Sequence, residues 1–133
     1  KVAVAKNKKV KMIVEVSPKV KKSIKKMSEY KLRNTCIVLG IYLDNALEAA
    51  ENSDQKLVSL EIYEINHNLN FTISNSYKEI IPLKKMKKKG FSTKGKNHGK
   101  GLYYVNKLVN KIKWIEVNQI FLNNFFIQKI SLK

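Results

Sequence analysis

The chain has little cysteine, little arginine and no long apolar run. Cys36 is the only cysteine among 133 residues, so no disulfide can form within the chain, and we interpret Cys36 as a structural thiol in a reducing compartment. The absence of any run of 18 apolar residues excludes a transmembrane helix. The apolar stretch at residues 2–5 is too short for a signal peptide. We therefore expect one folded domain.

Arginine is nearly absent although the chain is strongly basic. The net charge is +17, and Arg33 is the only arginine. The first 26 residues hold ten lysines against one acid, and residues 84–100 hold eight lysines and no acid. Such a surface can bind nucleic acid or an anionic membrane face. Because aromatic residues are not interleaved with the lysines and arginine is the preferred base reader, we expect no specific nucleic-acid partner, and a basic nucleic-acid binder stays an alternative.

Hydrophobic periodicity predicts a single α+β domain. The predicted strands span residues 10–16, 57–65, 70–75, 113–117 and 125–132. The predicted helices span residues 29–52 and 101–110, and residues 19–27 form a connection or a short helix. The polar segment 77–98 is weakly periodic, and a loop of that length in a compact domain is usually functional.

The helix predicted over residues 29–52 carries an apolar stripe and a polar motif. The stripe follows steps of three and four residues through Leu32, Cys36, Leu39, Leu43, Ala46 and Ala50, which we expect to be buried. Asn45 and Glu48 are three residues apart and therefore share a face. An amide oxygen facing a cavity suits Mg²⁺, which prefers hard oxygen ligands and shares them with substrate phosphates. The alternative is a solvated polar rim on an amphipathic helix.

Residues 91–105 combine glycines, lysines and hydroxyl groups directly before a helix-like segment. Gly95, Gly99 and Gly101 let the backbone pass close to a ligand, and exposed amides at a helix N-terminus attract phosphate. Interspersed lysines add positive charge. The segment does not match the P-loop pattern. It predicts a site for a nucleotide triphosphate, and the alternative is a flexible basic loop.

Together the two motifs resemble those of the GHKL ATPase superfamily. Residues 43–49, Leu-Asp-Asn-Ala-Leu-Glu-Ala, resemble its N box, and residues 92–105 resemble its second glycine box, in the same order and at a matching distance. The resemblance covers about residues 9–132 and is strongest to the ATP-binding catalytic domain of sensor histidine kinases of the Agr/VirS quorum-sensing type. It implies a Bergerat fold, a two-layer α/β sandwich in which a mixed, mostly antiparallel sheet packs against helices, with an ATP lid.

The resemblance also implies a site for ATP and Mg²⁺. Asn45 would ligate Mg²⁺, Glu48 would orient Asn45 or lie at the rim, and Asn75 would contact adenine. The expected nucleotide-binding residues are Asn45, Glu48, Asn75, Thr93, Lys94, Gly95, His98, Gly99, Gly101 and Leu102.

Three positions depart from the family pattern. Asn75 stands where most GHKL proteins carry an aspartate that reads the adenine amino group, and an amide oxygen also accepts a hydrogen bond from an amine. Ile41 lies four residues before Asn45, where hydrolytic members carry a glutamate base, so efficient ATP hydrolysis is not expected. His98 stands in a lid position where relatives often have arginine.

The implied function is transfer of the γ-phosphate of Mg-ATP to a histidine on a separate dimerisation domain in two-component signalling. His67 lies in a predicted turn and His98 in the glycine motif, so we expect the acceptor histidine, and any catalytic residue, to lie outside this fragment. The resemblance implies a cytoplasmic domain of a membrane-anchored bacterial kinase, homodimeric as a whole, with a response regulator downstream. An anti-sigma-type serine kinase and a degenerate nucleotide-binding interaction module stay open as alternatives.

Overall fold

The computed structural model describes residues 1–78 and 99–133, and for residues 99–102 it describes the backbone only. Within these ranges the helices are α1 (Val2–Asn7), α2 (Val20–Lys26), α3 (Glu29–Glu51) and α5 (Gly99–Lys111). The strands are β1 (Lys11–Val16), β2 (Leu57–Ile65), β3 (Asn68–Ser76), β4 (Ile115–Leu122) and β5 (Phe125–Leu132).

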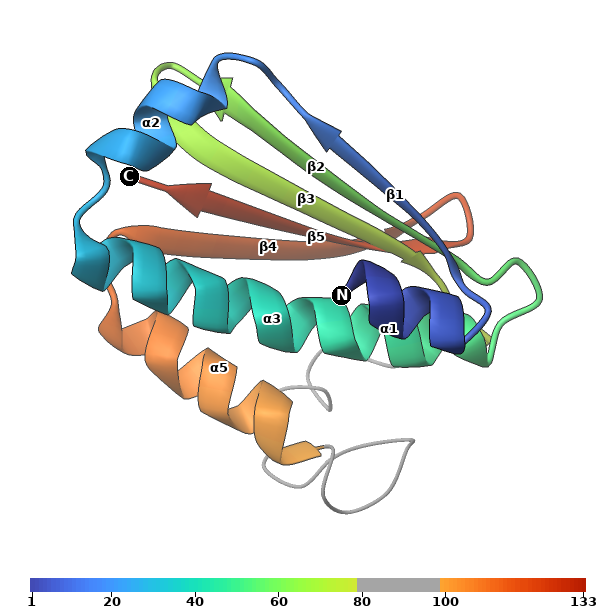
Figure 1. Ribbon diagram of the computed structural model, residues 1–133. Coiled ribbons are helices and arrows are strands. Elements are labelled where there is room, and N and C mark those ends of the chain that lie inside the picture. Colours follow the sequence, from blue (N-terminus) through green and yellow to red (C-terminus); the bar gives the residue numbers. More distant parts are fainter. Residues whose placement is uncertain (79–98) are drawn as a thin grey trace.

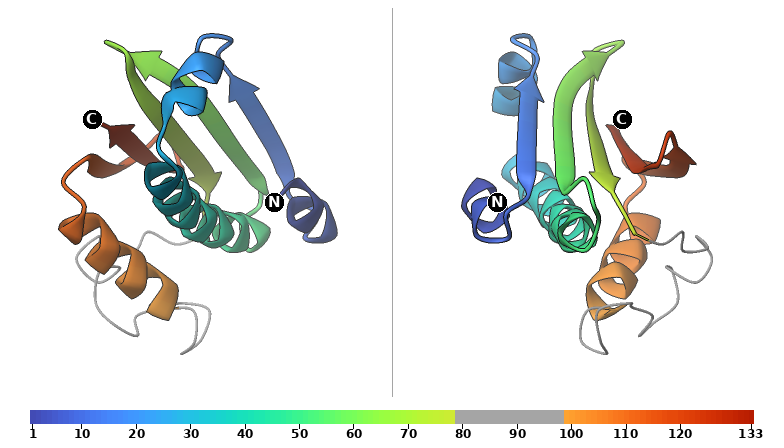
Figure 2. Two further views of the ribbon diagram at one scale, coloured as in Figure 1. Left: turned by 60° about the vertical axis from the view of Figure 1, so that its left-hand side comes forward. Right: turned by 90° about the vertical axis from the view of Figure 1, so that its right-hand side faces the viewer.

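The strands form one mixed sheet that is covered by helices on one side. Their order is β1-β2-β3-β5-β4; β1 runs parallel to β2, and every other neighbouring pair is antiparallel. Helix α3 crosses the sheet and packs on β2 and β3, while α5 packs on α3 and β4 (Figure 1). Two further views show the same arrangement of helices and sheet (Figure 2). The predicted two-layer α+β sandwich with a mostly antiparallel sheet is confirmed.

Both hairpins turn on pairs of residues with positive φ. Asn66 and His67 join β2 to β3 with φ values of 52° and 68°. Asn123 and Asn124 join β4 to β5 with φ values of 53° and 67°. Two-residue turns of this hand match the twist of the flanking strands, and asparagine tolerates the left-handed conformation better than most residues. The two predicted turns are therefore confirmed.

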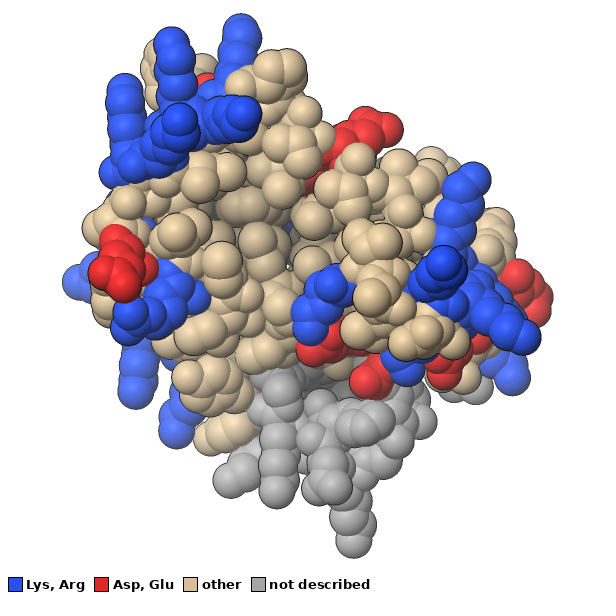
Figure 3. All heavy atoms as spheres, viewed as in Figure 1, with Lys and Arg blue, Asp and Glu red and all other residues tan. Residues whose placement is uncertain are grey.

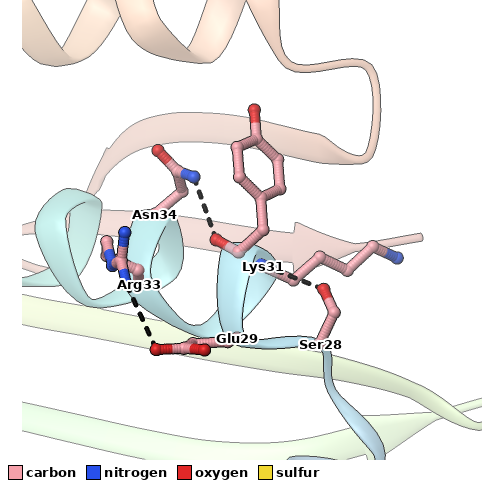
Figure 4. A network of polar contacts seen from close by, with 6 residues as sticks. Ser28, Glu29, Lys31, Arg33 and Asn34 are labelled. Carbon is pink, nitrogen blue, oxygen red and sulfur yellow. Dashed lines mark hydrogen bonds and ion pairs between the residues drawn. The ribbon is translucent and has the colours of Figure 1, made fainter.

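Side-chain caps define the start of α3. The Ser28 hydroxyl accepts a hydrogen bond from the Lys31 amide at 3.1 Å, which satisfies one of the free amides of the first turn (Figure 4). One turn on, Arg33 pairs with Glu29 at 3.2 Å, and the Asn34 side chain donates to the Tyr30 carbonyl at 2.9 Å. The predicted helix over residues 29–52 is confirmed to within one residue.

The buried face of α3 differs from the predicted stripe. Leu43, Ala46 and Ala50 are buried as predicted, but Leu32 and Cys36 are exposed. The helix buries Thr35, Val38, Tyr42, Leu43, Ala46, Leu47 and Ala50. Because the first half of the helix is apolar on several sides, periodicity fits two stripes that differ by one residue, or about 100° of rotation. The interpretation of Cys36 as a buried structural thiol is wrong.

Helix α1 precedes β1 and was not predicted. Its Ala5 is buried, and the Ala5 carbonyl accepts from the Val10 amide at 2.9 Å. Two ion pairs join this part of the chain to α3, from Lys1 to Asp44 at 2.5 Å and from Lys8 to Glu51 at 3.2 Å. Because the residues that make these ion pairs lie far apart in sequence, the local pattern of residues 1–10 does not predict the helix.

The core lies between α3 and the inner face of the sheet. Its fully buried members include Val38, Leu47, Val58, Ile73 and Ile130. Val105 of α5 and Ile112, the residue directly after that helix, belong to the same cluster. Among the described residues, no helix is both long and apolar enough to traverse a bilayer.

Candidate functional site

The polar motif of α3 lies on the half-buried side of the helix near its C-terminal end. Ile41, Asn45 and Glu48 follow at steps of four and three residues and are all half-buried. The Asn45 side-chain nitrogen donates to the Ile41 carbonyl at 2.9 Å, so Oδ1 is the acceptor atom of this amide and the kind of oxygen that ligates Mg²⁺. Asp44, by contrast, is exposed and pairs with Lys1. Asn45 and Glu48 therefore share a face as predicted, and Asp44 does not belong to it.

Asn75 is buried near the end of β3 with an unsatisfied acceptor. The residue is only 2% exposed, and its Nδ2 donates a hydrogen bond to the Ser76 carbonyl at 2.9 Å. Its Oδ1 has no hydrogen-bond partner among the residues that the structure describes. A buried acceptor without a donor costs about 1–3 kcal/mol, so this oxygen is a place where a ligand amine would bind favourably.

Hydrogen bonds of Ser76 hold this end of β3 against the end of α3. The Ser76 hydroxyl lies 2.6 Å from that of Ser53, which also donates to the Ala50 carbonyl at 2.7 Å. The Leu57 amide donates to the same Ser76 oxygen at 3.0 Å. Because Ser76 is next to Asn75 in the chain, this network fixes the position of Asn75 relative to the C-terminal part of α3.

An aromatic cluster adjoins Asn75 on the same face of the sheet. Phe126 is the direct neighbour of Asn75 across the β3–β5 ladder. The rings of Phe126 and Phe121 are 4.9 Å apart, and those of Phe121 and Tyr77 are 5.2 Å apart at 77°. Flat apolar surface thus lies beside a buried hydrogen-bond acceptor. The sequence analysis missed these three residues because their proximity depends on the β3–β5 register, which no local pattern specifies.

The glycine motif meets the described structure at the start of α5. Gly99 and Gly101 lie in the first turn of this 13-residue helix, whose first turn has no acidic residue. Backbone amides at such a start carry partial positive charge. Leu102 follows in the same helix, while Thr93, Lys94, Gly95 and His98 lie outside the described residues, as does most of the predicted lid.

The described residues provide few protein ligands for a metal. No group of three or more His, Cys, Asp or Glu side chains with metal-binding geometry occurs among them. Asn45 and Glu48 are the candidate oxygen ligands on α3. Such a sparse set fits Mg²⁺, which keeps several waters and takes further oxygens from substrate phosphates, better than it fits Zn²⁺.

Comparison with known proteins adds a family and several similar folds. A family model described as the GHKL domain matches residues 30–133. The search of curated proteins found no match. Among solved structures, the catalytic domain of the histidine kinase ThkA has a TM-score of 0.71 at 16% identity, covering 98% of this chain and 83% of that one.

Two larger kinases contain the same fold. The histidine kinase AdeS of Acinetobacter baumannii has a TM-score of 0.66 at 12% identity, and the match covers 99% of this chain and 60% of that one. Full-length ShkA in complex with AMPPNP has a TM-score of 0.66 at 17% identity, covering 96% of this chain and 26% of that one. At these identities the likeness concerns the fold.

Proposed function

We propose, because this chain belongs to the GHKL domain family, that it binds Mg-ATP and donates the γ-phosphate to a histidine on a separate dimerisation domain. The observation that carries the proposal is the buried Asn75 Oδ1, which has no donor among the described residues and lies beside the aromatic cluster of Tyr77, Phe121 and Phe126. An adenine ring supplies what this place lacks, an amino group for the oxygen and a flat face for the aromatic surface.

Each end of the nucleotide has a candidate partner. The adenine amino group donates to Asn75 Oδ1. The amides at the start of α5 hold the phosphates, together with residues of the glycine motif, Thr93, Lys94, Gly95, His98, Gly99, Gly101 and Leu102. Asn45 Oδ1 is the ligand for Mg²⁺, which when bound neutralises phosphate charge, and Glu48 orients Asn45 or lies at the rim.

The local chemistry of α3 supports transfer to another domain rather than to water. Ile41 places hydrocarbon one turn before Asn45, and Asp44 is paired with Lys1, so neither residue activates a water molecule there. His67 lies in the β2–β3 turn, and Asn75 is eight residues further along the chain, near the end of β3, so the two are separated by about 26 Å of extended chain. The acceptor histidine therefore belongs to another domain.

We place this domain on the cytoplasmic side of a membrane-anchored, homodimeric bacterial sensor kinase of the Agr/VirS quorum-sensing type, with a response regulator downstream in a two-component system. A degenerate nucleotide-binding module is the second candidate, because Asn75 replaces the charged residue that most members of the superfamily use.

Calorimetric titration of ATP into the chain tests the site. Asn75→Ala should weaken ATP binding about tenfold, the equivalent of one lost buried hydrogen bond. Asn118→Ala is the matched control, because Asn118 is an exposed asparagine on β4. Melting curves of both variants check folding. Equal ATP affinity of Asn75→Ala and the unsubstituted chain would remove Asn75 from the site, and absence of ATP binding by a folded unsubstituted chain would overturn the proposal.

A further inference from the structure

Five lysines crowd onto one short element far from the candidate nucleotide site. Helix α2 and the residue before it contain Lys19, Lys21, Lys22, Lys25 and Lys26, all of them exposed. Figure 3 shows basic side chains gathered at the corner of the molecule where Figure 1 places α2. Like charges three and four residues apart destabilise a helix, so the sequence bears a small cost for this arrangement.

These five lysines have no acidic partner among the described residues, in contrast to four other basic residues of the chain. Lys1, Lys8, Arg33 and Lys133 each form an ion pair. In the part of the chain that the structure describes, none of the five α2 lysines does so. The nearby carboxylate of Glu64 instead accepts a short hydrogen bond from the Ser23 hydroxyl. The charge of α2 is thus available to a partner.

Some of these lysines line a hollow beside α2. It has a volume of about 450 Å³ and lies between α2 and the β2–β3 turn, lined by Pro18, Lys19, Lys22, Ser23, Lys26, Glu64 and His67. Lys19, Lys22 and Lys26 follow at steps of three and four residues, so they share one face of the helix and project along one side of the hollow. Lys21 and Lys25 do not line it.

The hollow cannot serve the nucleotide that we propose for the other end of the domain. It adjoins His67 in the turn directly before β3, whereas Asn75 lies eight residues after His67, about 26 Å away at the rise of an extended chain. Asn45 lies 16 residues beyond the first residue of α3, which corresponds to about 24 Å of helix. The α2 lysines therefore form a charged surface that is separate from the candidate nucleotide site.

We propose that the α2 hollow binds an acidic, carboxylate-rich segment of a partner protein. Its concave form between a helix and a turn suits an inserted chain segment better than a flat bilayer. Neither an arginine nor a Phe, Tyr or Trp side chain is among the described residues that line the hollow, which disfavours the reading or stacking of nucleic-acid bases. A peptide can direct carboxylates to the lysines and a backbone amide to Glu64, whereas closely spaced phosphates would meet that carboxylate in repulsion.

Two double variants with the same charge change test the proposal. Lys22→Gln with Lys26→Gln removes lysines that line the hollow, and Lys21→Gln with Lys25→Gln removes two from the same helix outside it. The probe is a fluorescein-labelled decaglutamate peptide, with fluorescence anisotropy as the readout at 50 mM salt. We expect the first variant to weaken binding at least about fivefold and the second less than about twofold, because only pairs made at short range contribute appreciably.

Several outcomes would overturn the proposal. Absence of peptide binding would do so, and equal weakening by both variants would reveal attraction to net charge alone. Binding to vesicles of phosphatidylserine and phosphatidylcholine, but not to the peptide, would assign the surface to a membrane. ATP affinity should stay the same in both variants, so a failure of this proposal is distinct from a failure of the nucleotide site.

Discussion

At the scale of single residues, two buried polar atoms have no hydrogen-bond partner among the described residues but lie in different surroundings. Asn75 Oδ1 lies near the end of β3 beside aromatic rings, where we propose that adenine binds. The Tyr42 hydroxyl lies in the centre of α3, in a fully buried residue, and has no partner among the described residues. Burial raises the pKa of Tyr42 to about 12, because the phenolate would lose its hydration. An unsatisfied group within the core has no ligand to meet, so it lowers stability.

Replacing Tyr42 by phenylalanine should therefore stabilise the protein. The Tyr42 hydroxyl loses its hydration on folding without gaining a partner among the described residues, so its removal should favour the folded state. We expect an increase of about 1 kcal/mol in the free energy of unfolding. Urea unfolding at pH 7 measures the change, with Tyr104→Phe as the control because Tyr104 is exposed. A clear loss of stability in Tyr42→Phe would mean that the hydroxyl is hydrogen-bonded.

The same substitution should change how stability depends on pH. The folded-state pKa of Tyr42 exceeds the ordinary value of 10.0, so the protonated form is favoured by folding. The free energy of unfolding of the unsubstituted chain is therefore independent of Tyr42 ionisation below pH 10, and it falls as the pH rises from 10 towards 12. The advantage of Tyr42→Phe over the unsubstituted chain should thus be constant from pH 7 to 9 and grow above pH 10. All other side chains are common to the two proteins, so their contributions cancel in the difference.

Asn45 should carry the Mg²⁺ dependence of ATP binding. We expect EDTA to weaken ATP binding to the unsubstituted chain and to have no further effect on Asn45→Ala, because the metal ligand has gone. Asn34→Ala is a close control, since the Asn34 amide makes the same kind of bond to a carbonyl four residues back, also at 2.9 Å, at the other end of α3. An unchanged Mg²⁺ dependence in Asn45→Ala would remove Asn45 as the ligand.

At the scale of elements, α3 determines where both the core and the site lie. Its N-terminal cap and its contacts with β2, β3 and α5 fix one 23-residue helix. Ser28→Ala should lower the free energy of unfolding by about 1 kcal/mol, because the Lys31 amide loses its acceptor. Ser28→Asp should retain most of the stability, since aspartate caps equally well, and urea unfolding of the two variants measures the difference. Equal losses in both would indicate a packing effect instead.

The accuracy of the sequence analysis varied with how local each signal was. β2 and β5 have their predicted bounds because strand alternation and asparagine turns are local signals. β4 runs from Ile115 to Leu122 rather than over residues 113–117, because its length is set by pairing with all of β5. Likewise, the exposed Cys36 and the position of Phe126 beside Asn75 depend on which helix face meets the sheet and on strand register. Asn45, Asn75 and the glycines of α5 were therefore named as candidate site residues from the sequence, whereas the three aromatic residues beside Asn75 were not.

At the scale of the whole molecule, the proposed function makes the domain a phosphoryl donor that relies on another domain. We expect the isolated chain to bind ATP and hydrolyse it very slowly, with phosphotransfer appearing when a dimerisation domain with its histidine is added separately. Incubation with ATP labelled at the γ-phosphate, followed by gel autoradiography, measures this, and the same domain with its histidine replaced by alanine is the control. Rapid hydrolysis by the chain alone, abolished by Asn45→Ala, would instead identify a self-sufficient ATPase.

The placement of β1 has a consequence for how the molecule opens. Among the described strands, β1 lies at the edge of the sheet and pairs only with β2. Paired residues such as Lys11 of β1 and Leu57 of β2 are separated in the chain by both α2 and α3. Most of the β1 side chains are exposed, whereas β3 is paired on both sides and almost wholly buried. Its hydrogen bonds can therefore break without disturbing the centre of the sheet. Native-state amide exchange should find β1 opening at a lower free energy than β3, with the lysine-rich α2 released as part of the same unit.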